Sequence, residues 1–206
     1  MAEPKLGLTS ARRRSAAEAR GTLLVLVDDD NVLSRDYLSQ ALALATKHPQ
    51  VGAFGGSSVP NFETPPADWQ QECIGLLALR DMGPDPIFKK AASAKLEYPL
   101  CAPIGVGMCL RRSLMNTWLE QSMDHQLSDR TGTALSSGGD HEIVLAVCAA
   151  DGDVAYYPAL QLTHLIPQSR LQAEYLGRLN RRIQCSWIQV LDRHGIRPVN
   201  WSPIAN

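Results

Sequence analysis

The chain has 206 residues, of which 45% are hydrophobic and 20% are charged, so it can bury the core of one ordinary domain and is not disordered. Its formal net charge of −1 gives no general reason to expect nucleic acid as a partner, and we expect none. No stretch approaches the ~20 consecutive apolar residues of a membrane span. The five cysteines are odd in number and widely spaced, which is typical of small buried residues in a reducing compartment.

Helical and extended patterns alternate along the chain, which favours an α/β fold with a partly mixed sheet. Strands are expected at Thr22–Val27, Val51–Val59, Ile104–Leu110, Val154–Tyr157 and Leu160–His164. Helices are expected at Leu8–Arg20, from Ser34 to about His48, at Trp69–Arg80, at Ser113–Gln121, at His141–Ala150 and from Ser169 to about Arg193. The polar stretch Ser122–Gly138 is long enough to form a lid, and Lys89–Pro103 fits neither pattern.

The first strand is apolar at five consecutive positions, 23–27, which predicts burial on both faces. Three carboxylates follow it directly, Asp28, Asp29 and Asp30, at the end of the strand where open α/β sheets bind ligands. Such a group is tolerated when a divalent cation neutralises it, and oxygen ligands suit Mg²⁺ or Mn²⁺. The alternative is a solvated acidic turn before the next helix, and the triplet alone does not decide between the two.

Two further groups of polar residues follow. Asp140 and Glu142 open a helix after a glycine turn, either as simple capping residues or as a general base presented at the edge of the sheet. His164 ends a strand, where an imidazole is usually structural but can also complete an oxygen-rich metal site. Arg170 is either a surface arginine at a helix start or a planar fork for a diphosphate.

Taken together and in this order, these residues resemble family 2 glycosyltransferases of the GT-A fold. The order and spacing of the segments make the resemblance specific, and it spans nearly the whole chain. The segments are EPKLGLTSAR at Glu3–Arg12, LLVLVDDDNVL at Leu23–Leu33, GVGMCLRR at Gly105–Arg112, GGDHE at Gly138–Glu142, YYP at Tyr156–Pro158 and HLIPQSRL at His164–Leu171. The most similar variants act in bacterial polysaccharide assembly.

The resemblance implies a site for a nucleotide-sugar donor, with a UDP-sugar expected, and a Mg²⁺ or Mn²⁺ ion on its diphosphate. The residues that it implies for the metal are Asp28, Asp30 and His164. The residues that it implies for the donor are Arg12, Asp28, Asp29 and Arg170.

The resemblance also implies an acceptor side. Asp140 matches the general base of inverting members, which takes the proton of the acceptor hydroxyl as its oxygen attacks the anomeric carbon. Gly105, Gly107 and Glu142 fall in the acceptor region, and the acceptor is expected to be a glycan or a lipid-linked molecule. Gly139 stands where the family usually has glutamate, so either Glu142 supplies that charge or the acceptor site is altered.

The fold expected from the resemblance is a mixed, mostly parallel α/β sheet flanked by helices. It lacks the family's first strand–helix–strand unit, which binds the nucleotide base. We expect residues 1–168 to form this partial domain and residues 169–206 to form a C-terminal amphipathic helix and tail. Without the first unit the strand at 22–27 leaves an unprotected edge. We therefore expect the chain alone either to associate through that edge or to behave poorly in solution, and to turn over no nucleotide sugar.

The function expected is inverting sugar transfer in polysaccharide or glycoconjugate synthesis. The alternatives are a non-catalytic remnant that binds metal or a partner, and a nucleotidyltransferase on a similar sheet. A cytoplasmic location is expected. The final helix carries an apolar stripe beside Arg178, Arg181 and Arg182, so it either packs on its own domain or contacts the inner face of the membrane.

Overall fold

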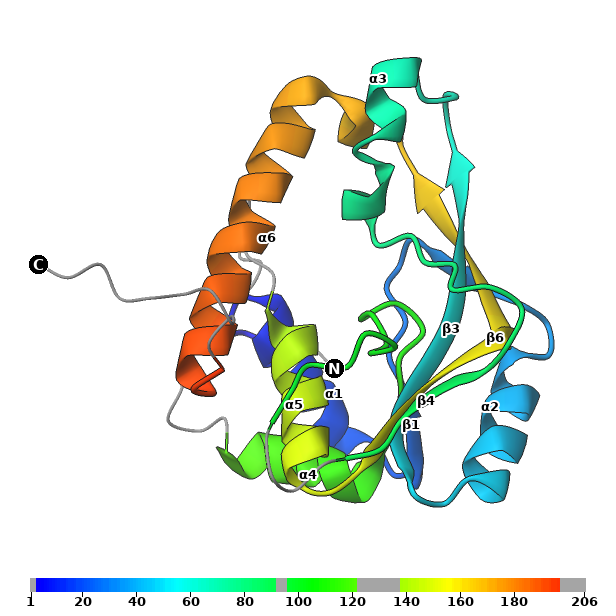
Figure 1. Cartoon of the computed structure of the whole chain (residues 1–206), viewed down its shortest axis with the longest axis vertical. Coiled ribbons are helices and arrows are strands. Elements are labelled where there is room, and N and C mark those ends of the chain that lie inside the picture. Colours follow the sequence, from blue (N-terminus) through cyan, green and yellow to red (C-terminus); the bar gives the residue numbers. More distant parts are fainter. Residues whose placement is uncertain (1–2, 92–95, 122–137, 197–206) are drawn as a thin grey trace, which may run out of the picture.

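The computed structural model describes residues 3–91, 96–121 and 138–196. They form a curled mixed sheet between two layers of helices (Figure 1). The strands are β1 (Leu23–Val25), β2 (Asn31–Leu33), β3 (Val51–Phe62), β4 (Ile87–Lys89), β5 (Cys109–Arg111) and β6 (Asp153–Ile166). The α-helices are α1 (Leu8–Glu18), α2 (Tyr37–Lys47), α3 (Asp68–Gln71), α4 (Arg112–Gln121), α5 (Gly139–Ala149) and α6 (Ala173–Arg193), and the 3-10 helices are η1 (Ile74–Leu77) and η2 (Gln168–Leu171). The lid predicted at Ser122–Gly138 lies outside the described residues, except for Gly138.

The strand order is β1-β5-β3-β6-β2, and β4 pairs with β6 beside this path. The helix-flanked, mixed α/β sheet is confirmed, but its pairing differs from the expectation of a mostly parallel sheet. Only β3 and β6 run parallel among the strands of the described residues, while β1 with β5, β3 with β5, β2 with β6 and β4 with β6 are antiparallel. The parallel β3–β6 ladder is the longest and forms the centre of the sheet.

The strand β1 lies at an edge of the sheet, where it pairs only with β5 in the described part of the chain. Only Leu24 of its three residues is fully buried, and Val27 just beyond it is 46% exposed. Both faces of β1 nevertheless pack on the core, since Leu24 belongs to one core cluster while Leu23 and Val25 pack against the other, so the predicted burial on both faces is partly confirmed. The expected unprotected edge is observed.

The strand β6 is one long element, whereas two short strands were predicted on either side of Pro158. The register of the β3–β6 ladder shifts between Gly55 and Ser57, which places Pro158 in an irregularity instead of ending the strand. Gly56 lies here so close to β6 that a Cβ would overlap the backbone oxygens of Leu160 and Tyr157. Gly56 thus marks a close approach of two backbones.

Most predicted helices are present with small changes at their ends, and one is not. The expected helix Trp69–Arg80 is reduced to the short α3 and η1. Ala78 follows η1 in the left-handed conformation, with φ of 55°, which stops the helix. Arg80 then forms a β-bridge with Ser58, so contact with the sheet replaces the final helical turn.

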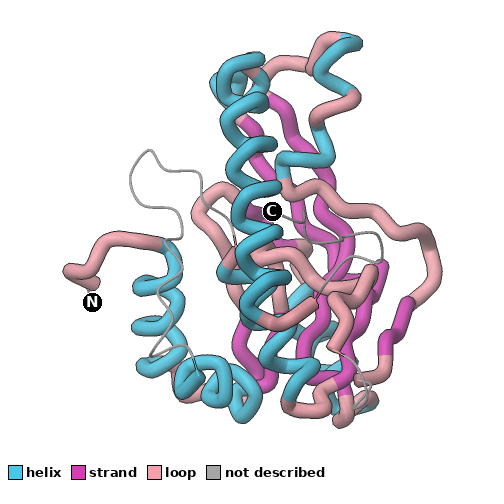
Figure 2. The backbone as a smooth tube through the Cα atoms, turned by 60° about the vertical axis from the view of Figure 1, so that its left-hand side comes forward, coloured by secondary structure: helices cyan, strands magenta, loops and turns pink. Residues whose placement is uncertain are grey.

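The helices cover both faces of the sheet. Helices α1, α4 and α5 share one core cluster with the sheet, and α2 packs on the other face around the fully buried Tyr37. The helix α6 packs against α5, η1 and η2 on the outer side of the helical layer (Figures 1 and 2). Its residues Leu176, Leu179 and Val190 are buried, so much of its apolar stripe packs on its own chain.

Among the described helices none combines the length and the apolar character needed to cross a membrane. All five cysteines are free. Burial raises the pKa of Cys109 to about 12 and that of Cys148 to about 11, so both thiols stay protonated at neutral pH. Cys185 is exposed on α6, unlike the buried residue that the sequence predicted.

Candidate functional site

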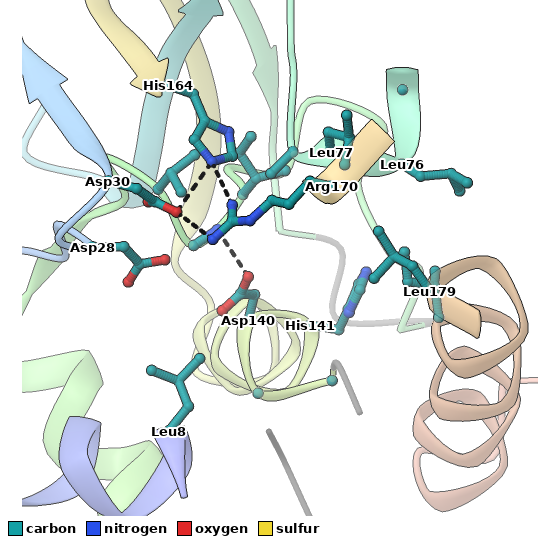
Figure 3. A pocket seen from close by; sticks show the side chains of 18 of the residues that line it. Leu8, Asp28, Asp30, Leu76, Leu77, Asp140, His141, His164, Arg170 and Leu179 are labelled. Atoms are coloured by element: carbon teal, nitrogen blue, oxygen red, sulfur yellow. Dashed lines mark hydrogen bonds and ion pairs between the residues drawn. The ribbon is translucent and has the colours of Figure 1, made fainter. Parts of the chain in front are cut away.

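One cavity of about 260 Å³ gathers most of the residues that the sequence singled out. This volume is slightly below the ~300–1,000 Å³ of typical ligand pockets, so a whole nucleotide sugar would extend beyond it. The charged residues that line it are Asp28, Asp30, Asp140, Arg12 and Arg170, which leaves one excess negative charge. Figure 3 shows the three aspartates facing a common space.

Asp28 and Asp30 lie in the turn that connects β1 to β2. The turn is closed by the backbone N–H of Asn31, which donates to the Asp28 carbonyl at 3.1 Å. The strand β2 then pairs with β6, with Asn31 opposite His164, and this register brings Asp30 beside His164. The backbone of Leu165 donates to the Asp30 carbonyl at 2.8 Å and fixes the turn against β6.

The carboxylate of Asp30 is held by three side chains. Arg170 approaches its Oδ2 with Nη2 at 2.7 Å, and His164 Nε2 lies 3.4 Å from the same oxygen. Asn31 donates to the Oδ1 at 3.1 Å. His164 is buried because it continues the inward row of Leu160 and Leu162 along β6.

Asp140 projects from the first turn of α5, where a negative charge is favoured by the free N–H groups and the helix dipole. Its Oδ1 forms an ion pair with Arg12 of α1, and the side chain of Arg12 is almost fully buried. The backbone N–H of Gly105 donates to its Oδ2 at 2.9 Å. A Cβ at position 105 would overlap both carboxylate oxygens and a guanidinium nitrogen of Arg12, so this contact requires glycine.

The loop that carries Gly105 is anchored at Gly107, which contacts Leu26 just after β1 and Tyr37 of α2. Gly107 donates to the Leu26 carbonyl at 2.9 Å and adopts a φ of 72°, which favours glycine. Its own carbonyl accepts a hydrogen bond of 2.5 Å from the hydroxyl of Tyr37. Gly107 therefore shapes the loop from behind and does not line the cavity.

The remaining wall of the cavity is mainly apolar and comes from η1 and α6, with Leu76, Leu77 and Leu179 visible in Figure 3. His141 also lines it, and its ring stacks with those of Tyr98 and Trp187 at 5.0 and 4.8 Å. Burial and then the negative charge of Asp140 raise the pKa of Tyr98, which keeps that phenol neutral. Sequence reasoning missed this wall, although Tyr175, Leu179 and Ile183 are spaced as one face of a helix.

Besides Gly107, two more of the implied site residues lie outside the cavity. Asp29 is exposed in the turn between its two neighbours. Glu142 points toward the end of α6, where it contacts His194 at 2.7 Å and Arg193 at 3.9 Å. The structure thus brings together Arg12, Asp28, Asp30, Gly105, Asp140, His164 and Arg170, and it leaves Asp29, Gly107 and Glu142 apart from them.

The carboxylates fit a divalent cation that is shared with a ligand. No group of three histidine, cysteine, aspartate or glutamate residues is arranged to hold a metal ion within the described ranges 3–91, 96–121 and 138–196. Mg²⁺ usually takes only one or two carboxylates and completes its shell with water and substrate phosphates. Asp28 and Asp30 on one wall, together with the excess negative charge, match that incomplete set.

Comparison with known proteins identifies the family. The family model for the glycosyltransferase-like family 2 matches residues 3–185. The chain therefore belongs to this family, and it is a domain of the glycosyltransferase family 2 type. Among curated proteins none matches the sequence significantly.

Solved structures give only distant similarities. A mycobacterial protein is 17% identical, with a TM-score of 0.47, over 94% of this chain and 53% of its own. A structure of GalNAc-T7 with UDP, GalNAc and Mn²⁺ is 13% identical, with a TM-score of 0.48, over 87% of this chain and 35% of its own. The chain thus spans about half of the first protein and about a third of the second.

Proposed function

We propose that this cavity binds the diphosphate of a nucleotide-sugar donor with Mg²⁺ or Mn²⁺, and that the site transfers the sugar to an acceptor hydroxyl with inversion. Membership of the glycosyltransferase-like family 2 supports the reaction class. The observation that carries the proposal is that Asp28 and Asp30 share one cavity with Asp140, although these residues are far apart in the sequence.

The donor end of the proposed reaction lies at Asp28, Asp30 and Arg170. Asp28 and Asp30 would hold the metal, and His164 would keep Asp30 in position beside it. The bound metal would supply positive charge to the diphosphate as it leaves. Arg170 would donate two parallel hydrogen bonds to the diphosphate oxygens through its planar guanidinium.

The acceptor end lies at Asp140. The acceptor oxygen forms a bond to the anomeric carbon as the bond to the diphosphate breaks, and Asp140 takes the hydroxyl proton. The diphosphate leaves with the electron pair of the broken bond. Because attack and departure occur on opposite faces of the carbon, the product has the inverted configuration.

We further propose a UDP-sugar as the donor, and a glycan or a lipid-linked molecule of polysaccharide or glycoconjugate synthesis as the acceptor. The proposed location is cytoplasmic, with peripheral contact of the exposed Arg178, Arg181 and Arg182 of α6 at the inner face of the membrane as a second possibility. The division into units at 1–168 and 169–206 also stays a prediction.

A thermal-shift experiment tests the donor site without turnover. A ligand that binds the folded state raises the melting temperature. We expect Mn²⁺ with UDP to raise it by more than the sum of the two separate shifts, and Asp30→Ala to abolish this synergy. Asp85→Ala serves as the matched control, because Asp85 is exposed and does not line the cavity.

Two results would revise the proposal. An unchanged synergy in Asp30→Ala removes Asp30 from the site. A loss of synergy in Asp29→Ala would make the exposed Asp29 a ligand after all.

The edge of β1 leads to a prediction about self-association. Its free side presents unpaired backbone groups of the kind that join sheets from two molecules. We expect the 206-residue chain to associate in solution, and Leu23→Pro, which cannot donate along the edge, to reduce this association. Sedimentation velocity measures both. A monodisperse monomer that transfers sugar contradicts the expectation.

A further inference from the structure

The ion pair of Asp30 with Arg170 occupies the place that the proposed donor site needs for its metal. Arg170 Nη2 lies 2.7 Å from Asp30 Oδ2, and its Nη1 lies 3.1 Å from His164 Nε2 (Figure 3). The other oxygen, Oδ1, accepts from Asn31. Both oxygens of Asp30 therefore have partners, and a cation is one of them.

The position of Arg170 allows its guanidinium to move away from Asp30. The arginine lies on the single turn of η2, directly after β6, and 27% of its side chain is exposed. Its contacts with Asp30 and His164 are made at the end of a long side chain, so it can rotate away without moving the backbone. A divalent ion on the same oxygen would weaken the contact with the guanidinium, because the two positive charges would lie close together and repel each other.

We infer that Arg170 is the resident counter-cation of Asp30 and that it exchanges between Asp30 and the diphosphate when the donor and the metal bind. This inference rests on the proposed donor site. Metal alone must break the Arg170–Asp30 pair with no replacement partner for the arginine. A diphosphate supplies that partner, since its oxygens accept both N–H groups of the guanidinium.

The exchange makes metal and diphosphate bind cooperatively. Breaking the Arg170–Asp30 ion pair costs free energy when either ligand binds alone. When both bind, the diphosphate takes over Arg170 and the metal takes over Asp30, so this cost is offset for each ligand by the other. The coupling must be equal in both directions, so the factor by which UDP tightens Mn²⁺ equals the factor by which Mn²⁺ tightens UDP.

The test measures Mn²⁺ affinity from the electron paramagnetic resonance signal of the free ion, with and without UDP. We expect UDP to tighten Mn²⁺ binding to the wild type by a factor within the range of about 5–150 that is usual for coupled sites. In Arg170→Met, Mn²⁺ alone should bind more tightly than to the wild type, and the factor contributed by UDP should decrease to the part that comes from direct contact between the metal and the diphosphate. Arg170→Lys keeps the charge, so Mn²⁺ alone should bind as to the wild type while the UDP factor decreases.

The controls separate this exchange from a general loss of charge. Arg178→Met removes the same charge from an exposed position on α6. It should leave unchanged both the affinity for Mn²⁺ alone and the factor by which UDP tightens Mn²⁺ binding. Asp30→Asn should abolish Mn²⁺ binding in the wild type and in Arg170→Met alike. If Mn²⁺ alone binds Arg170→Met no more tightly than the wild type, Arg170 is not its competitor and the inference is wrong.

One outcome distinguishes the inference from the proposed function. Suppose that Arg170→Met binds Mn²⁺ more tightly than the wild type, but that UDP changes the Mn²⁺ affinity of neither the wild type nor the variant. The competition between Arg170 and the metal for Asp30 is then supported, and the donor proposal fails. If UDP and Mn²⁺ remain fully coupled in Arg170→Met, the donor proposal is supported and the exchange is excluded.

Discussion

The cavity contains two arginine–aspartate pairs that are held in different ways. In the first, Arg12 is 7% exposed and Asp140 is 26% exposed, and a backbone N–H from Gly105 takes the second carboxylate oxygen. In the second, Arg170 and Asp30 are 27% and 21% exposed. The difference lies mainly in the arginine, which is enclosed in the first pair and reachable by solvent in the second.

The comparison teaches that the same chemical pair can serve two purposes. An enclosed guanidinium together with a backbone donor holds a carboxylate in one orientation, as a base aimed at a hydroxyl requires. An accessible guanidinium neutralises a carboxylate only until a stronger partner arrives. Burial of the arginine therefore decides whether the pair is a fixed support or an exchangeable contact.

The largest expected effect comes from removing the fixed carboxylate. In an active form of the protein, Asp140→Asn should lower turnover by about 10²–10⁴-fold, the usual loss for a missing general base. Donor affinity should hardly change, since the proposed diphosphate contacts lie at Asp30 and Arg170. Steady-state kinetics for both substrates measure this. Turnover within a few-fold of the wild type would make Glu142 the next candidate.

Removing each arginine tests the comparison directly. Arg12→Met leaves a partly buried carboxylate without its charge partner, so the free energy of unfolding should fall toward the lower end of the ~3–5 kcal/mol typical of broken buried pairs. Arg170→Met should cost less than about 1 kcal/mol, as for accessible pairs. Urea unfolding of both variants measures the difference. Equal losses would show that burial does not separate the two pairs.

A double variant sharpens this result. Asp140→Asn removes the charge that Arg12 neutralises, so adding it to Arg12→Met should cost less than the two single losses together. Strict additivity would mean that Arg12 stabilises the fold through its packing alone.

A loss of turnover smaller than that of Asp140→Asn is expected from crowding the backbone support. In Gly105→Ala the added Cβ meets the Asp140 carboxylate, so it should displace the base and lower turnover by up to about 10²-fold. Overpacking should also cost ~1–3 kcal/mol of folding stability. The matched control is Gly177→Ala in α6, where nothing lies within 4 Å of the new Cβ and a gain of up to ~1 kcal/mol is expected. Wild-type turnover in Gly105→Ala would show that Asp140 does not depend on this contact.

Much of the architecture follows from local sequence patterns. The helices α1, α2, α4 and α5 and the strand β3 lie close to where periodicity and capping residues predict them. The acidic turn after β1 and the start of α5 both line one cavity. The local pattern failed where distant contacts decide the structure, as at Arg80, which bridges to Ser58 in place of ending a helix.

The pairing of side chains in the cavity depends on contacts that no local pattern reveals. Arg12 and Asp140 are separated by 128 positions in the sequence, and their ion pair depends on how α1 packs near the start of α5. The resemblance to the family placed Arg12 near the donor, whereas its recorded ion pair is with the proposed base. Glu142 lies only two residues after Asp140, yet the turn of the helix directs it to α6.

The central β3–β6 ladder has a consequence for how the protein folds. Val51 lies opposite Asp153 and Phe62 opposite Ile166, so the ladder joins segments roughly a hundred residues apart, a separation typical of slow folding. A ribosome-bound chain that has emerged only as far as α5 already contains β1, β3 and Asp30 but not His164 or Arg170. During synthesis Asp30 therefore has neither of these two partners until β6 and η2 have been made. Until β6 pairs with β3, the incomplete sheet also has unpaired edges that a chaperone can bind.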